Sequence, residues 1–182
     1  MNRRAFTLVE LLIVMAIIIV LAGLVIATSG YVQEKSKRSR TEAEIAAMSA
    51  ALESYKADNG IYPTNPDTAA LYPTAHFNPD PDSRAADAQY FTAGLYLYTQ
   101  LSGNDGNQQP SPAARSYFQF KPQLVGQRNG IVFLRDPFGN SYGYSTAKSE
   151  VPTGRDGYNP TFDLWSTGGT IDGNQAKWLK NW

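Results

Sequence analysis

The sequence predicts an α+β fold in which one long amino-terminal helix packs on a small antiparallel sheet. Three observations lead to this prediction. An apolar run from Leu11 to Ala27 carries no charge, residues 33–58 contain neither Gly nor Pro, and short apolar runs between turn residues follow later in the chain. The first two patterns are typical of helices, and the third is typical of strands.

The apolar run has the length and composition of a membrane-spanning helix. About 20 predominantly apolar residues cross the roughly 30 Å hydrocarbon layer of a bilayer. A cleaved secretory signal is the alternative, but its apolar region is about 7–15 residues long and ends at a small-residue site. The run here is longer, and its best small-residue site, Ala22-Gly23, lies inside it. We therefore expect a retained span, whose orientation the basic residues on both flanks leave open.

One acid, Glu10, lies at the start of this apolar segment. A carboxylate in lipid is costly to keep, so its presence there is a hypothesis of function by default. The alternative is that Glu10 occupies the first turn of the helix, where the macrodipole favours a negative charge. We favour a role in assembly inside the membrane.

The helix is expected to continue beyond the membrane. Residues 33–58 are rich in good helix formers, and their apolar residues recur at spacings of three and four, at Ile45, Met48, Leu52 and Tyr55. The run Asp58-Asn59-Gly60 then predicts the end of the helix. The chain is thus divided into a leader at 1–5, a transmembrane half-helix at 6–30, an amphipathic half-helix at 31–58 and a globular domain at 59–182.

The globular domain is expected to mix helix and strand around one small core. The prolines of residues 61–89 predict a loop, and residues 90–101 fit either a strand or a helix, of which we favour the helix. Strands are predicted at residues 117–120, 131–134, 141–145 and 162–165. A turn at residues 136–140 joins the second predicted strand to the third.

Composition argues against several function classes. Sixteen basic and sixteen acidic residues give no net charge, so the molecule has no overall field that attracts nucleic acid. The chain contains no cysteine, which excludes disulfides and thiolate metal sites. The one histidine, His76, lies in a proline-rich loop, and the common nucleophile, phosphate and zinc motifs are absent from the sequence. We therefore expect no enzyme, and we assign the aromatic residues to a core rather than to a sugar-binding surface.

Three segments of the chain resemble prepilin-type proteins, the type IV pilins and the pseudopilins. The run Arg-Ala-Phe-Thr-Leu-Val-Glu at residues 4–10 resembles the family's peptidase site. Residues 45–63 are similar to the major pseudopilin of type II secretion. The run Asp-Pro-Phe-Gly-Asn at 136–140, Asp-Leu-Trp-Ser at 163–166 and the closing Lys-Asn-Trp are similar to the same protein. Residues 64–115 are not covered by the resemblance.

The resemblance implies a pilin-like fold and a processing step. A membrane peptidase on the cytoplasmic face would cut between Ala5 and Phe6, and the new amine of Phe6 would be methylated. Relatives usually carry Gly before the cut, so Ala5 departs from their pattern. The mature chain would be a single-pass protein of the bacterial inner membrane, with its carboxyl-terminal domain outside the cytoplasm.

The resemblance also implies a role for Glu10. Its carboxylate would pair with the Phe6 amine of a neighbouring subunit, in a low dielectric where an unmatched charge costs several kcal/mol. The implied function is that of a structural subunit of a homo-oligomeric helical filament, either a periplasmic type II secretion pseudopilus or a cell-surface type IV pilus. A membrane-anchored surface binding module that never polymerises is the alternative.

The implied partners follow from that function. They are further copies of the chain, the prepilin peptidase, minor pilins or pseudopilins, an inner-membrane assembly platform and, before assembly, membrane lipid. Calcium is the one metal that the resemblance suggests, because major pseudopilins bind it in a carboxyl-terminal loop. Here that loop, residues 166–178, holds a single acid, Asp172, whereas calcium takes about six to eight oxygens. We therefore expect no cofactor and favour a turn role for Asp172 over a calcium role.

Overall fold

The structure is a computed structural model, which describes residues 7–75, 77–82, 86–105, 109, 111, 114–128, 130–154 and 156–182. The chain forms two compact units, one up to Lys37 and one from Arg38 onward. Helix α1, Leu8–Asn59, begins in the first unit and ends in the second.

The first unit consists of the amino-terminal part of α1. Every described side chain from Leu8 to Ile26 is exposed, and the exposed fractions of the large apolar ones run from 51% at Val14 to 76% at Leu8. These side chains therefore form an apolar surface that their own unit does not bury.

In the second unit, α1 has the predicted apolar stripe. Ile45, Met48 and Leu52 are at most 5% exposed, so this side of the helix faces a core. The helix ends where the sequence predicts, because Gly60 adopts a positive φ of 81° and donates its N–H to the Lys56 carbonyl at 2.8 Å. Glycine adopts this left-handed conformation without the strain that a Cβ introduces.

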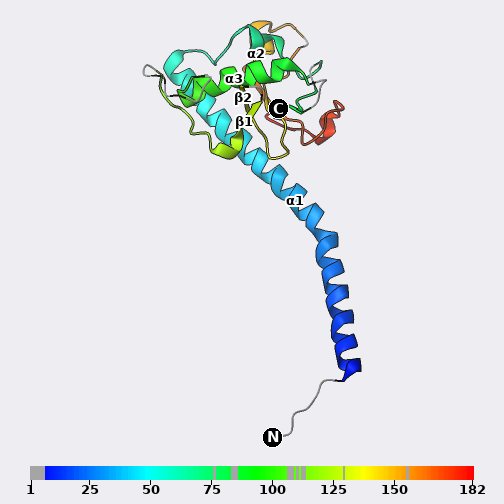
Figure 1. The fold of residues 1–182 in the computed structure, drawn as a ribbon. Helices are drawn as coiled ribbons and strands as arrows, with labels where there is room; N and C mark the ends of the chain where they lie inside the picture. The colour runs from blue at the N-terminus through cyan, green and yellow to red at the C-terminus, as the bar shows by residue number, and fades with distance from the viewer. Residues whose placement is uncertain are drawn as a thin grey trace. The chain divides into compact units, whose positions relative to one another are not determined.

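Helix α3, Ala88–Ser102, confirms the helical interpretation of residues 90–101. Asp87 caps its amino terminus, and the buried side chains Tyr90, Leu97 and Leu101 face the core. Figure 1 shows α3 lying across β2, with α2 beside it.

The sequence predicted a loop at residues 61–89, but the structure contains a short helix within this interval. A reciprocal cap between Asn65 and Thr68 stabilises this helix, α2, Pro66–Ala70. Pro66 stands at the start of the helix, where its missing N–H costs nothing. Another one-turn helix, α4, spans Ala147–Glu150, and two 3₁₀ turns, η1 and η2, span Pro122–Leu124 and Gln175–Lys177.

The strands form two small antiparallel sheets rather than the single sheet that was predicted. In the first sheet β1, Val125–Arg128, pairs with β2, Ile131–Leu134, and Val125 lies opposite Leu134. In the second sheet the order is β3-β4-β5, with Gly143 opposite Trp165. Its strands are β3, Gly143–Ser145, β4, Asp163–Ser166, and β5, Leu179–Lys180.

The predicted strand at residues 117–120 is wrong. The N–H groups of Tyr117 and Phe118 both donate to the Leu101 carbonyl, at 2.8 and 2.9 Å, so this segment closes the end of α3. Its rings pack as side chains, and those of Phe118 and Phe120 lie 4.7 Å apart. The strand of this region is β1, which the sequence did not reveal.

Two clusters of buried side chains make up the interior of the second unit. The larger one joins α1, α3 and the strands, and its three buried tyrosine hydroxyls have partners. The Tyr98 hydroxyl accepts the Asn104 side-chain amide at 3.1 Å. Tyr142 donates to Glu44 at 2.7 Å, and Tyr144 donates to the Pro63 carbonyl at 2.8 Å.

The smaller cluster is aromatic and fixes the carboxyl-terminal tail. Trp165 is fully buried, donates its indole N–H to the Tyr90 hydroxyl at 2.9 Å and stacks on Trp178 at 6.2 Å. Its indole also lies against Gly143, where no Cβ would fit. Trp165 and Trp178 thus belong to the interior of the domain, and Trp182 packs against them.

Candidate assembly site

The start of α1 carries a reciprocal cap between Thr7 and Glu10. The Thr7 hydroxyl oxygen accepts the Glu10 N–H at 3.2 Å, and Glu10 Oε2 accepts both the Thr7 N–H and the Thr7 hydroxyl, each at 2.8 Å. This is a capping box, which satisfies backbone N–H groups that have no partner within the helix. The pattern Thr-x-x-Glu at residues 7–10 is the local sequence signal of this cap.

The carboxylate of Glu10 has one engaged oxygen and one open oxygen. Both hydrogen bonds that it accepts go to Oε2, and within the described residues Oε1 accepts none. Glu10 lies in the first turn of α1, the position that the macrodipole alternative requires. Ala5 and Phe6, the predicted cleavage and methylation residues, lie outside the described residues, and the pairing of Glu10 with a second chain stays a prediction.

After this cap, the exposed side chains of α1 up to Ile26 form a continuous apolar surface. Within the described residues, α1 is the one helix long and apolar enough to cross a membrane, by length and composition. Its apolar side chains point in all directions around the axis, as in a helix that is surrounded by lipid or by other helices.

The turn that begins at Asp136 belongs to one of the segments that carry the resemblance to pseudopilins. The Asp136 side chain is 2% exposed, and its Oδ1 accepts the N–H groups of Phe138 and Asn140 at 2.9 and 2.8 Å. Its Oδ2 accepts the Ser166 hydroxyl at 2.6 Å, which ties the turn to β4. Burial raises the pKa of the Asp136 carboxyl to about 6, although these hydrogen bonds act in the opposite direction. The partner Ser166, thirty positions along the chain, was not predictable from local sequence.

Asp172 lies in an exposed turn. Its Oδ1 accepts the Asn174 N–H at 3.0 Å, and Gly173 follows it with a positive φ of 76°. The described residues contain no group of three or more His, Cys, Asp or Glu side chains that could hold a metal ion. This geometry fits the turn role, and a calcium role for Asp172 stays untested.

Comparison with known proteins gives one family match and several similar relatives. Residues 1–26 match the family described as the prokaryotic N-terminal methylation motif. The type II secretion system core protein G of Pectobacterium carotovorum subsp. carotovorum is 36% identical over 87 residues, 47% of this chain and 56% of the relative. That of Escherichia coli strain K12 is 42% identical over 63 residues, 35% of this chain and 43% of the relative. That of Vibrio cholerae serotype O1 is 34% identical over 80 residues, 44% of this chain and 55% of the relative.

The amino terminus of the chain thus carries a prepilin-type methylation motif. Up to 47% of the chain is similar to the type II secretion core protein G. The chain spans about half the length of the curated relatives that it matches. No solved structure matches the chain.

Proposed function

We propose that the chain is a structural subunit of a type II secretion pseudopilus, assembled from the bacterial inner membrane after removal of its leader. The observation that carries this proposal is one capped acid, Glu10, at the start of an apolar helix whose side chains are exposed in their own unit. A single-span anchor would use the apolar surface and the cap, but it would not use the open Oε1 of Glu10. A subunit that assembles through this helix would use all three.

The cap suggests how Glu10 acts before and during assembly. In the separate chain, Thr7 supplies two donors to Oε2, which lowers the cost of keeping a carboxylate near lipid. Oε1 stays open to a further donor, so the amine of Phe6 on a second chain can bind without breaking the cap. Either charge left unmatched in a low dielectric costs several kcal/mol, so the pair fixes the register of neighbouring subunits.

The similarity to core protein G favours a pseudopilus over a type IV pilus. The proposed partners are further copies of the chain, a prepilin peptidase, minor pseudopilins, the inner-membrane assembly platform and, before assembly, lipid. The proposed location is the bacterial inner membrane, with a single span and the globular domain at 59–182 outside the cytoplasm. The surface binding module is less well supported, because Trp165 and Trp178 lie in the interior and are at most 5% exposed.

The test compares two acids of the same helix. Glu10→Ala and Glu34→Ala each remove one exposed carboxylate from α1, but only the first removes the capped acid. The chain is expressed with a type II secretion assembly system and its peptidase, and sheared filaments are counted by electron microscopy.

The proposal predicts filaments from the unaltered chain and from Glu34→Ala. It predicts that Glu10→Ala enters the membrane and is processed but does not form filaments. Filaments of normal number from Glu10→Ala would contradict the role of the acid. Failure of the unaltered chain to form any filament would contradict the proposed function itself.

A further inference from the structure

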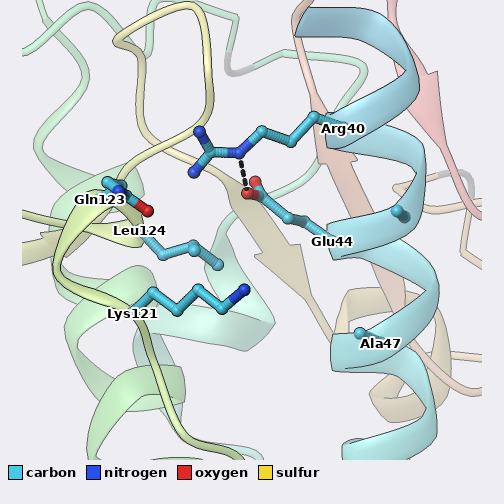
Figure 2. A pocket seen from close by; sticks show the side chains of 7 residues that line it. Arg40, Glu44, Ala47, Lys121, Gln123 and Leu124 are labelled. Carbon is cyan, nitrogen blue, oxygen red and sulfur yellow. Dashed lines mark hydrogen bonds and ion pairs between the residues drawn. The ribbon is translucent and has the colours of Figure 1, made fainter. Parts of the chain in front are cut away.

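A groove lies between α1 and the η1 turn of the second unit. Its volume is about 470 Å³. Figure 2 shows Arg40 and Glu44 of α1 directed toward Gln123 and Leu124, while the Lys121 side chain extends back toward α1. The lining residues, which we name the cationic groove, are Arg40, Ala43, Glu44, Ala47, Lys121, Gln123 and Leu124.

Both carboxylate oxygens of Glu44, the acid of the cationic groove, have partners within the chain. Glu44 Oε1 pairs with Arg40 Nε at 2.7 Å, and Glu44 Oε2 accepts the Tyr142 hydroxyl at 2.7 Å. Lys121 has no ion pair or hydrogen bond from its ammonium group to any described residue. The groove thus offers an unpaired cation above an apolar floor of alanine and leucine side chains.

A second hollow, of about 260 Å³, lies between α1 and the end of the chain. The ammonium of Lys180 is held over the Trp182 ring at 5.0 Å and the Tyr158 ring at 5.9 Å, so aromatic faces already stabilise its charge. The Glu42 carboxylate is exposed and bonds to no described side chain. The lining residues, which we name the acidic groove, are Glu42, Ile45, Ala46, Ser49, Lys180 and Asn181.

The two grooves lie on opposite sides of the same helix. Successive residues of an α-helix are rotated by about 100°, so Glu42 is turned by about half a revolution from the side that carries Arg40, Glu44 and Ala47. Between the grooves runs an exposed ridge of small residues, which includes Ala43, Ala46 and Ala50. An unpaired cation and an unpaired acid therefore flank one narrow ridge and face away from each other.

We propose that these grooves are the two complementary halves of a contact between copies of this chain, in which Lys121 of one copy pairs with Glu42 of the next. This inference rests on the proposed function. Since the two patches differ and lie on opposite sides of α1, the contact is head-to-tail, and repeated head-to-tail contacts build open helical filaments. The charges are complementary between copies and have no partner among the described residues of one copy, and the small ridge lets the second copy approach α1 closely.

The first experiment reverses the charges one at a time and then together. Lys121→Glu and Glu42→Lys each place like charges across the contact, and the double variant restores an opposite pair with reversed sign. Arg128→Glu is the matched control, because Arg128 lies at the end of β1 and lines neither groove. The full chain is expressed with the assembly system, sheared filaments are counted, and thermal unfolding in detergent reports whether each variant is folded.

The inference predicts that each single variant is folded but yields about tenfold fewer filaments, while the double variant and Arg128→Glu yield normal numbers. Folded single variants with normal filament yield would overturn it, and so would a double variant as defective as the single ones. A loss of filaments from the unaltered chain would instead count against the proposed function.

The second experiment uses the absence of cysteine from the chain. Lys121→Cys and Glu42→Cys are combined in one chain, assembled filaments are oxidised, and the products are separated without reductant. The inference predicts that the double variant gives a series of covalent oligomers of increasing length. Either single variant should give no covalent product larger than a dimer. Monomers alone from assembled, oxidised double-variant filaments would overturn it. Arg128→Cys with Glu42→Cys is the matched control, and it is expected to give no such series.

Discussion

The two halves of α1 share one backbone geometry but differ in what their side chains contact. In the first half, Ile18 is 53% exposed and its apolar neighbours are similarly open. In the second half, Met48 and Leu52 are 0% exposed, and the residues from Arg38 onward that are exposed are polar or small. A helix that is apolar on all sides needs partners outside its own domain, whereas a helix with one apolar stripe has its partner inside the domain.

The two halves of α1 should therefore contribute to different free energies. Substitutions in the stripe should change the free energy of unfolding of the second unit. Substitutions in the first half should leave that free energy unchanged and act only on membrane insertion or on assembly. The predictions below test this separation, from the largest expected effect to the smallest.

Met48→Ala is expected to have the largest effect. Removing a fully buried methionine side chain leaves a cavity and costs about 2–5 kcal/mol of the free energy of unfolding. Ile18→Ala is the matched truncation in the first half, and it should change that free energy by less than about 0.5 kcal/mol. Urea unfolding of the full chain in detergent, followed by tryptophan fluorescence, measures both. If both truncations lowered the free energy of unfolding equally, the distinction between the two halves of α1 would be wrong.

The buried carboxyl of Asp136 predicts how stability depends on pH. Its pKa is raised from 3.8 to about 6 in the folded chain, so the folded state binds this proton more tightly than the unfolded state. This contribution is fully present below about pH 4 and is lost as pH rises through about 6. It amounts to about 2–3 kcal/mol.

Asp136→Asn removes the titrating group, so its unfolding free energy should depend less on pH between about 4 and 6 than that of the unaltered chain. Urea unfolding in detergent at several pH values in this interval provides the measurement. The same slope in both proteins would show that Asp136 does not titrate there. Because Asp136 lies in the second unit, Ile18→Ala should leave the slope unchanged.

Thr7→Ala removes the hydroxyl of the cap at the start of α1. Loss of a capping side chain costs about 1 kcal/mol, and here the cost is local because Thr7 and Glu10 contact each other. Amide hydrogen exchange in detergent should become faster in the first turn of α1 and stay unchanged in the second unit. Thr7→Ser keeps a hydroxyl and should exchange like the unaltered chain. Unchanged exchange of the first turn in Thr7→Ala would show that the cap contributes little.

The smallest effect is expected for the surface ion pair between Arg115 and Asp58. Its side chains are 71% and 38% exposed, so solvent screens the attraction. Asp58→Asn should lower the free energy of unfolding by less than about 1 kcal/mol. A loss comparable to that of Met48→Ala would show that stability is not concentrated in the buried stripe.

The helices were largely predictable from the sequence because their signals are local. The spacing of Ile45, Met48 and Leu52 predicted the buried side of α1, and Gly60 predicted its end. The helical period of residues 90–101 likewise predicted α3.

The strands were harder because their pairing is not local. Strand β1 reads Val-Gly-Gln-Arg and has little strand propensity of its own, so it forms because β2 pairs with it. Residues 117–120 have the composition of a strand, but their backbone bonds to the end of α3. At the candidate site the acid Glu10 was predictable, whereas the open Oε1 and the two grooves beside α1 depend on three-dimensional placement.

Mass spectrometry of the amino terminus of chains taken from sheared filaments tests the central claim most directly. The proposed assembly through the first half of α1 requires a positive amine on Phe6, next to Thr7, at about the same depth in the membrane as Glu10. The account predicts that filament chains begin at Phe6 and carry a methylated amine. Filaments whose chains still begin at Met1 would contradict it.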